Sequence, residues 1–527
     1  MVYKQRVKLL IILTTVLLLV ATVYSQQIDK TQNPNLAEAG IAKSFFQQIG
    51  VGRGDVMTPE SSAFIISRDP FRAIRRGRQI FQRKFLRSQG HGPLANDGAG
   101  DVMTNLALGA GLADSCSTCH SRPRGSGGFG GAVATRPDSR DAPHLFGLGL
   151  KEMLADEMTA DLRSIRSEVI AKAQQRRRPI TRQLTSKGTS FGSLTAYEDG
   201  SVNTSKVEGV DSDLRVRPFF MHGGTISIRE FIVGAFNDEM GLQAVDTELA
   251  KAHNGSTMIT PSGMVLNGAL DQINAPPADD QTIDPDGDGI ANEIPTSIVD
   301  FMEFYFLNYF KPATYQQTAE TERGGDLFQR IGCAQCHIPD LLIKRDRRVA
   351  DVETSYDPNR GGFNNLFATA RLLTTAAEDG ISFPSLKRPQ MNPFLVKGIF
   401  TDLKRHDLGP NFYERNYDGT VRTQFLTTPL WGVGSTAPYG HDGRSVNLQE
   451  AILRHGGEAQ TARDAFAAMS SRRRSTLIDF LNSLVLFPPD DTASNLDPAD
   501  RNAPNFPQFG HGSIKLPNLF NDPHDPE

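Results

Sequence analysis

Apolar residues recur at spacings of three and four positions in several parts of this chain, a pattern typical of helices that bury one face. The longest run predicts one amphipathic helix, which Pro179 would end because proline cannot continue a helix. The apolar face of this helix consists of Leu150, Leu154, Met158, Leu162, Ile165 and Val169.

Two shorter runs predict further helices. An aromatic-rich segment predicts a helix from Ser297 to Phe310, opened by Pro295 and by a capping box between Ser297 and Asp300. A closing helix would carry four apolar residues, Leu477, Phe480, Leu481 and Leu484. The hydrophobic pattern therefore favours a mainly α fold.

The chain also contains an internal repeat. The segment 76–83 (RGRQIFQR) resembles the segment 323–330 (RGGDLFQR), and each would open a helix that leads to a pair of cysteines. Downstream, residues 220–230 resemble residues 439–450, because in both a turn rich in glycine precedes an S/N-x-x-E capping box and an apolar helix. The repeat predicts two related helical domains.

The first residues have the pattern of an export signal. Lys4, Arg6 and Lys8 precede an uncharged apolar stretch from Leu9 to Val20, and small residues allow cleavage after Ser25. We interpret residues 1–25 as a signal peptide, with an uncleaved membrane anchor as the alternative. We therefore expect a periplasmic or secreted protein. After cleavage it should have no membrane span, since no later segment approaches ~20 apolar residues.

Charge and cysteine content narrow the chemistry. The formal net charge of −4 is too small to indicate a nucleic acid or an acidic surface as partner. The chain has only four cysteines, and all of them lie in two Cys-x-x-Cys-His motifs, Cys116–His120 and Cys333–His337. No cysteine is left for a disulfide elsewhere.

Cys-x-x-Cys-His is the signature of covalent haem c attachment. Cys116 and Cys119 would form thioethers to one haem, and His120 would bind its iron; Cys333, Cys336 and His337 would hold a second haem in the same way. Two exported disulfides that each happen to precede a histidine, or one zinc site built from the four cysteines, would leave both histidines unexplained. The expected cofactors are therefore two covalently bound haems.

These observations give a domain plan. We expect a linker over residues 26–60, a first cytochrome c-like haem domain with insertions over residues 61–310, and a second one over residues 311–490. A tail rich in proline, asparagine and aspartate follows over residues 491–527. The expected fold is thus mainly α, with two cytochrome c-like haem domains and long loop insertions.

The sequence resembles the bacterial di-haem oxidoreductases, which are related to di-haem cytochrome c peroxidase. Besides the two haem motifs, the resemblance rests on residues 142–150 (APHLFGLGL), 428–434 (TPLWGVG), 437–443 (APYGHDG) and 450–458 (EAILRHGGE). The last two segments are the most specific, whereas the long insertions and both ends of the chain match poorly.

The resemblance implies that His455 is the second axial ligand of the haem on His337, in a position where the peroxidases use methionine. Gly456 and Gly457 would let the backbone approach the haem closely. Histidine in place of a thioether should lower the reduction potential of this haem. The alternative is that His455 is an ordinary surface residue of a helix.

The first haem is where the resemblance places substrate chemistry. The catalytic candidates are His144 and His222, and Met240 is a weaker candidate for the sixth iron ligand. His406 lies in another segment that resembles the family, and His441 is expected to fix its turn by hydrogen bonds. Trp431, the only tryptophan, would either relay electrons between the haems or pack in the core.

Residues 284–295 resemble a short calcium-binding loop. The candidate ligands are Asp284, Asp286, Asp288, Asn292 and Glu293. A glycine occupies the sixth position, where such loops turn tightly, but the twelfth position lacks the glutamate of an EF-hand. An acidic, glycine-rich turn without a metal is the alternative.

Three functions follow from these features. The first is an exported haem-dependent oxidoreductase, peroxidase-like, with electron transfer between the two haems, a small oxidant such as hydrogen peroxide and a redox partner protein. The second is a non-catalytic di-haem electron-transfer cytochrome. The third is a haem oxidase that acts on a protein or thiol substrate. The chain has about 250 residues per haem, more than the ~100 of a simple carrier, which favours an enzyme.

Overall fold

The computed structural model describes residues 44–92, 111, 113–120, 132–133, 140–308, 317–348, 350–356, 366–372, 376–378, 384–386, 393–416 and 418–484. The predicted signal peptide and the predicted C-terminal tail lie outside these residues. None of the helices within the described ranges is both long and apolar enough to cross a membrane.

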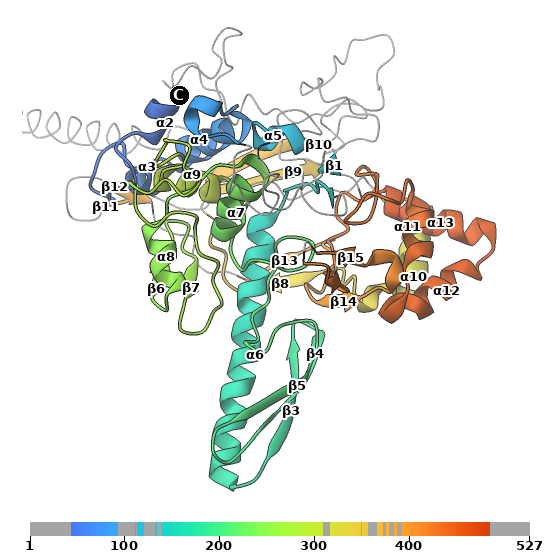
Figure 1. The fold of residues 1–527 in the computed structure, drawn as a ribbon. Helices are drawn as coiled ribbons and strands as arrows, with labels where there is room; N and C mark the ends of the chain where they lie inside the picture. The colour runs from blue at the N-terminus through green and yellow to red at the C-terminus, as the bar shows by residue number, and fades with distance from the viewer. Residues whose placement is uncertain are drawn as a thin grey trace, which may run out of the picture.

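The first half of the chain is built around helices that share one hydrophobic core (Figure 1). Its helices are α2 (Phe45–Ile49), α3 (Ser62–Arg68), α4 (Pro70–Gln82), η2 (Arg87–Gln89), α5 (Cys116–Cys119), α7 (Ile228–Met240), α8 (Thr247–His253) and α9 (Thr296–Leu307). Two antiparallel pairs accompany them, β1 (Ala132–Val133) with β2 (Arg140–Asp141) and β6 (Thr257–Ile259) with β7 (Val265–Asn267). Helix α9 is central, because nearly all of its side chains are buried.

The long helix predicted from the apolar stripe is present as α6 (Leu148–Arg176). It ends three residues before Pro179, where Arg177 adopts a left-handed conformation. Beside its second half lies a three-stranded antiparallel sheet, β3 (Ile180–Ser186), β4 (Thr189–Ala196) and β5 (Val202–Val207). Helix and sheet together form an arm that extends away from the other helices (Figure 1). Leu184, Phe191 and Leu194 of the sheet are buried in the same core cluster as the apolar stripe.

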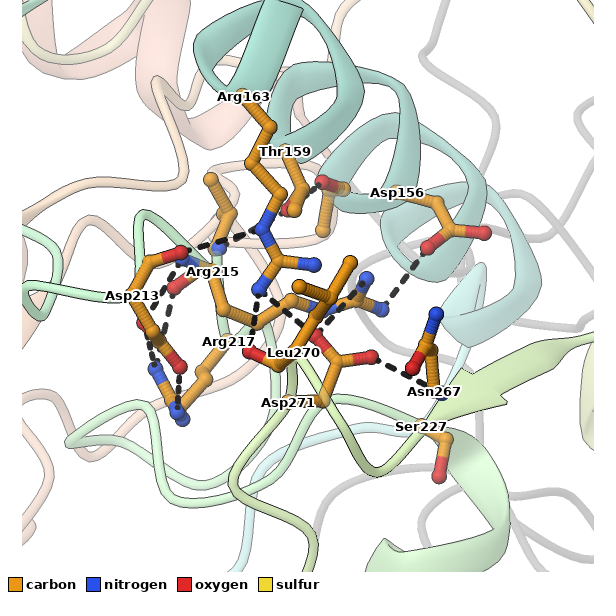
Figure 2. Close-up of polar contacts among 12 residues, drawn as sticks. Asp156, Thr159, Arg163, Asp213, Arg215, Arg217, Ser227, Asn267, Leu270 and Asp271 are labelled. Atoms are coloured by element: carbon orange, nitrogen blue, oxygen red, sulfur yellow. Dashed lines mark hydrogen bonds and ion pairs between the residues drawn. The ribbon is translucent and has the colours of Figure 1, made fainter. Parts of the chain in front are cut away.

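Ion pairs anchor the base of this arm, as Figure 2 shows. The Arg163 guanidinium on α6 lies 2.9 Å from the carboxylate of Asp271, and the Arg215 guanidinium lies 2.8 Å from that of Asp156, also on α6. Asp271 is almost fully buried, so its charge needs a partner of opposite sign. These contacts hold the loops before α7 and after β7 against α6.

The second half contains the remaining helices and several short antiparallel sheets, and its α-helices lie to one side of α6 (Figure 1). Its helices are α10 (Ala319–Arg330), η3 (Cys333–Gln335), η4 (Pro410–Phe412), α11 (Leu448–Arg454), η5 (Gly457–Ala459), α12 (Gln460–Ala467) and α13 (Ser471–Asn482). Its paired strands are β8 (Leu341–Ile343) with β13 (Phe394–Val396), β9 (Ala350–Tyr356) with β10 (Leu366–Leu372), β11 (Ala376–Glu378) with β12 (Pro384–Leu386), β14 (Arg405–Asp407) with β17 (Gln424–Leu426), and β15 (Glu414–Arg415) with β16 (Val421–Arg422).

The internal repeat has a structural counterpart in two helix crossings. Gly77 of α4 packs against the backbone of Phe301 in α9, and a Cβ atom on Gly77 would overlap the Phe301 oxygen. Gly324 of α10, the equivalent residue of the second half, packs in the same way against the backbone oxygen of Thr476 in α13. Glycine is needed at both positions because the two helices of each pair approach too closely for any side chain.

The turns before α7 and α11 also correspond. Isolated antiparallel bridges join Phe219 to Thr225 in the first half and Tyr439 to Ser445 in the second. Each helix then begins with the predicted cap: the Ser227 hydroxyl accepts from the Glu230 N–H, and the Asn447 side chain accepts from the Glu450 N–H.

The predicted fold class, mainly α with two cytochrome c-like haem domains and loop insertions, is wrong: the described residues mix helices with eight small antiparallel sheets. Most of these strands have only two or three residues, too few for an alternating pattern to appear in the sequence. The arm sheet escaped detection because serine and threonine alternate there with few large apolar residues, although Lys187 and Gly188, both at positive φ, mark its hairpin turn.

One helix start also differs from the prediction. Helix α9 begins at Thr296 after Pro295, but Ser297 and Asp300 form no capping box. The Ser297 hydroxyl donates instead to the backbone oxygen of Ile49, and Asp300 accepts from Ser62 and from Arg229, which is fully buried. Long-range partners therefore take the place of the local cap.

Candidate functional site

The first Cys-x-x-Cys-His motif forms one helical turn, α5, with His120 directly after it. The Nδ1 atom of His120 lies 2.7 Å from the backbone oxygen of Pro143, and this carbonyl can only accept, so Nδ1 donates. This arrangement fixes the ring by one nitrogen and assigns the other, Nε2, to a metal, as in other histidine ligands of metalloproteins.

The second motif repeats this geometry. Cys333 begins the short helix η3, and the Nδ1 atom of His337 lies 3.1 Å from the backbone oxygen of Phe400. In both motifs, therefore, a carbonyl about 20 to 60 residues further along the chain orients the histidine. The donor set and the orientation of both histidines fit a haem with a histidine axial ligand.

Each motif opens into its own largely apolar cavity. The cavity of Cys116, Cys119 and His120 has a volume of about 200 Å³, and the cavity of Cys333, Cys336 and His337 has a volume of about 440 Å³. Because the two cysteine pairs line different cavities, the single zinc site considered from the sequence is excluded.

Burial acts on the thiols of both motifs. It raises the pKa of Cys116 to about 12, that of Cys119 to about 11 and that of Cys333 to about 12. Burial therefore disfavours the thiolate form of these cysteines.

A common wall separates the two cavities. Asp141, Ala142, Pro143 and His144 from the first half line both of them, as do residues 426–429 and Trp431 from the second half. Trp431 is buried, and Gly147 lies against its indole so closely that a Cβ atom there would overlap the ring. Trp431 is therefore a packed core residue that also borders both cavities.

His144 lies in this wall with both ring nitrogens bonded to the backbone. Its Nδ1 accepts from the Phe146 N–H at 3.3 Å, and its Nε2 donates to the Trp431 oxygen at 3.0 Å. Burial lowers the pKa of His144 to about 3, so the ring is neutral. A catalytic role for His144 stays a prediction, but these bonds indicate a ring that holds the wall in place.

The other catalytic candidate, His222, is not among the residues that line either cavity. Its ring stacks on Phe220 and abuts Gly224. The preceding residue, Met221, faces both cavities instead. The catalytic role of His222 also stays a prediction.

Two residues at the end of α7 line the first cavity. Met240 is buried there, where the sequence proposed a weak iron ligand, and Glu239 lies beside it, close enough to Cys119 to raise the pKa of that thiol. Sequence reasoning missed Glu239, although it directly precedes a residue that was singled out. It is an acid–base candidate inside the cavity.

His455 lines the second cavity together with His337. It follows the last residue of α11, and its Nδ1 atom lies 2.7 Å from the backbone oxygen of Ala451, so Nε2 is the nitrogen assigned to a metal. Burial lowers the pKa of His455 and favours the neutral ring that a metal requires. The structure thus brings both predicted axial ligands to one cavity.

Gly456 and Gly457 lie in close contact with the backbone of residues 407–408, and their predicted approach to the haem stays a prediction. Gly456 donates to the Leu408 oxygen at 2.9 Å, and a Cβ atom on Gly457 would overlap the Asp407 oxygen. The two glycines therefore bring the chain after His455 against strand β14.

His441 and His406 also face the second cavity. His441 stacks on Phe425, with ring centroids 4.1 Å apart, and burial lowers its pKa to about 4. Its backbone oxygen accepts from the Asp141 N–H at 2.9 Å, which ties the turn to the first half of the chain. His406 lies between the carboxylates of Asp402 and Glu458.

The predicted calcium loop brings three of its carboxylates together. The ligand oxygens of Asp284, Asp286 and Asp288 all lie within 4.8 Å of one another. The Glu293 carboxylate instead accepts from the Gln243 N–H at 2.6 Å. Asn292 has a positive φ of 58° and carries a buried side-chain oxygen.

In each of the two cavities, a Cys-x-x-Cys-His motif and a histidine oriented by a carbonyl fit the attachment of a haem. The model of the family described as "Di-haem oxidoreductase, putative peroxidase" matches residues 390–484, so this part of the chain carries the sequence of that family. The match confirms the resemblance predicted from the sequence, and it covers His406, Trp431, His441 and His455.

Other comparisons add little. A search of curated proteins finds no match. A structure of Kuenenia stuttgartiensis hydrazine synthase under 20 bar xenon aligns with 86% of this chain and 100% of its own, at 13% identity and a TM-score of 0.30. A similarity this low carries no argument about the fold or the function.

Proposed function

We propose that this protein is an exported di-haem c-type oxidoreductase that reduces a peroxide at the first cavity with electrons delivered through the second. The observation that carries the proposal is the pair of Cys-x-x-Cys-His cavities with a shared wall.

The first cavity suits the reaction site. Haem bound there would supply the redox-active iron, with Cys116, Cys119 and His120 as its attachment residues. Reduction of hydrogen peroxide to two water molecules consumes two electrons and two protons. Glu239 is the residue best situated to take a proton from one peroxide oxygen and return it to the departing one, since it lies in the cavity beside Met240.

The second cavity suits electron storage and transfer. Cys333, Cys336 and His337 would attach the haem, and His455 would complete its coordination. Such a haem has no open position for substrate and a lower potential than one with a methionine ligand. Trp431 is buried in the wall that electrons would cross.

Export and the partner complete the proposal. The N-terminal signal pattern supports a periplasmic or secreted location, and a redox protein outside the cytoplasm would supply the electrons. The same compartment provides calcium at a concentration that a short loop can use. We propose that Asp284, Asp286 and Asp288 bind calcium, with Asn292 as a further oxygen donor.

Electron paramagnetic resonance of the haem-loaded protein, oxidised and half-reduced, with and without cyanide, tests the function. We expect a high-spin signal that cyanide converts to low-spin, together with peroxide turnover. Two low-spin haems that ignore cyanide in both redox states would instead indicate an electron carrier.

The variant Glu239→Gln sharpens the test. Its peroxide turnover should fall by about 10²–10⁴-fold while cyanide binding persists, because only the proton step is lost. The matched control is Asp238→Asn, which changes the neighbouring carboxylate of α7 that does not line the first cavity. Equal turnover in both variants and the unchanged protein would remove Glu239 from the mechanism.

A further inference from the structure

The His406 ring bridges two carboxylates beside the second cavity. Its Nε2 lies 2.8 Å from Asp402 Oδ2, and its Nδ1 lies 2.7 Å from Glu458 Oε2. An ionised carboxylate only accepts, so both ring nitrogens donate and the ring is an imidazolium. Burial lowers the pKa of His406, but the hydrogen bonds with Asp402 and Glu458 outweigh this effect and raise the pKa above its ordinary value. The side chain is almost completely buried.

One end of this bridge is fixed to the segment that orients His337. Asp402 is buried two residues after Phe400, whose backbone oxygen accepts from His337 Nδ1 at 3.1 Å. The other oxygen of Asp402 accepts from the Lys404 N–H at 2.9 Å, which holds the carboxylate in place. A displacement of Asp402 would therefore move the carbonyl that aims His337.

The other end is fixed to the segment that carries His455. Glu458 follows His455 by three residues, and its second oxygen accepts from the Asp407 N–H at 2.9 Å. Gly456 and Gly457 allow this segment to lie directly on strand β14, next to His406. A side chain at Gly457 would push Glu458 and His455 away from the strand.

We propose that His406 is a positioning residue, and that the Asp402–His406–Glu458 group sets the separation between His337 and His455 so that both bind the second haem iron. This inference rests on the proposed His337/His455 coordination. It adds to that proposal the reason why the two residues, 118 positions apart in the sequence, line one cavity together. The charge of the bridge matters because a neutral imidazole has one N–H group and could donate to only one of the two carboxylates.

A metal ion at this place is a poorer explanation. Donor atoms of Cys336, Asp402 and His406 lie within 4.8 Å of one another, a spacing that a cation could use. The Cys336 sulfur, however, would be a thioether once haem is attached, and both nitrogens of His406 already face carboxylates. The group is therefore complete without a metal.

The test compares the second haem in His406→Gln, Glu458→Gln and the unchanged protein, all loaded with haem. Glutamine at position 406 keeps a hydrogen-bond donor but removes the charge and one of the two bonds. We expect both variants to convert part of the second haem from low-spin to high-spin and to raise its carbon monoxide affinity in the ferrous state at least tenfold. The spectrum of the first haem, in the same molecule, should remain unchanged.

Lys404→Gln is the matched control. Lys404 lies between Asp402 and His406 and pairs with Glu208, outside the bridge. This variant loses a charge near the site and should leave the second haem low-spin. A high-spin second haem in Lys404→Gln as well would overturn the assignment to His406, since any nearby charge change would then suffice.

His455→Ala separates this inference from the proposed function. A second haem that stays low-spin without His455 would mean that the proposed ligand pair is wrong. A second haem that opens in His455→Ala but stays low-spin in both His406→Gln and Glu458→Gln would overturn the positioning role alone. If His406→Gln fails to incorporate haem, the spectra of Glu458→Gln decide whether the bridge positions the two histidines. This variant leaves the His406–Asp402 contact in place.

Discussion

The side chain of His144 donates from Nε2 to the backbone oxygen of Trp431, 3.0 Å away, and so joins the two halves of the chain across the wall between the cavities. The other ring nitrogen accepts from the Phe146 N–H. A protonated ring could not accept this second bond. The wall therefore needs a neutral His144, and its integrity should depend on pH.

Burial lowers the pKa of His144 to about 3, whereas the unfolded chain has its ordinary value near 6.5. Between these values the unfolded state binds more protons, so stability rises with pH and falls on acidification from about 6.5 towards 3. One such histidine contributes up to ~1.4 kcal/mol per pH unit within this window. His441, with its pKa lowered to about 4, acts in the same direction.

Urea unfolding of the haem-loaded protein between pH 7 and pH 4 checks this expectation. His144→Gln keeps a donor for the Trp431 oxygen but cannot titrate, so its stability should fall less steeply with acid than that of the unchanged protein. Buried carboxylates contribute equally to both proteins and cancel in the difference. Parallel stability curves would show that His144 does not set the acid sensitivity.

The two glycines of α10 offer a prediction about packing. Gly324 lies against the Thr476 oxygen without room for a Cβ atom, whereas the nearest atom to a Cβ on Gly325 would be Phe480 Cε2 at 3.4 Å. We expect Gly324→Ala to lower the free energy of unfolding by about 1–3 kcal/mol through overpacking.

Gly325→Ala is the matched control. It should be neutral or should stabilise the protein by up to ~1 kcal/mol, because alanine favours the helix. Thermal melting of the two variants side by side decides the matter. Similar losses in both would mean that the α10–α13 crossing does not depend on close backbone contact, and would weaken the equivalence with Gly77.

The parts of the molecule that were predictable from the sequence are those encoded over short distances. The two cysteine motifs, the apolar face of α6 and the caps of α7 and α11 each depend on residues within a few turns of one another. The predicted approach of Gly456 and Gly457 to the haem stays a prediction, whereas their close contact with the backbone of Asp407 and Leu408 was not predicted from the sequence.

What escaped prediction depends on contacts between distant residues. His406 and Glu458 are 52 positions apart, and His144 and Trp431 are 287 positions apart, so no local pattern links them. The strands escaped for a different reason, because segments as short as Arg405–Asp407 carry no measurable alternation. Glu239 could have been found from the sequence, because it directly precedes Met240, which the comparison of the two halves placed near the first haem.

The identity of the residue at position 455 should set the potential of the second haem. His455→Met exchanges an imidazole for a thioether, which stabilises reduced iron. We expect the midpoint potential to rise on the order of 100 mV, a fraction of the ~0.8 V over which axial ligands tune haem.

Spectroelectrochemical titration resolves the two haems, and the first haem serves as the internal control. Its potential should stay constant in His455→Met, because His455 does not line the first cavity. If the potential of the second haem also stayed constant, His455 would be a residue near the iron rather than its ligand.

The loop before α9 should bind calcium and thereby stabilise the first half of the chain. Its three clustered carboxylates repel one another without a cation, and the loop leads directly into α9, which packs against α4. Calcium at 100 times its dissociation constant would add about 2.7 kcal/mol to the free energy of unfolding. Isothermal titration of chelator-treated protein measures the affinity, and melting with and without calcium measures the stabilisation.

Asp286→Asn should weaken calcium binding at least tenfold, because it removes one of the clustered charges. Asp280→Asn is the control, since Asp280 lies four residues before the cluster and accepts from Thr282 instead. Equal calcium affinity in both variants, or no binding heat at millimolar calcium, would leave the loop as an acidic turn whose carboxylates are held by its own backbone N–H groups.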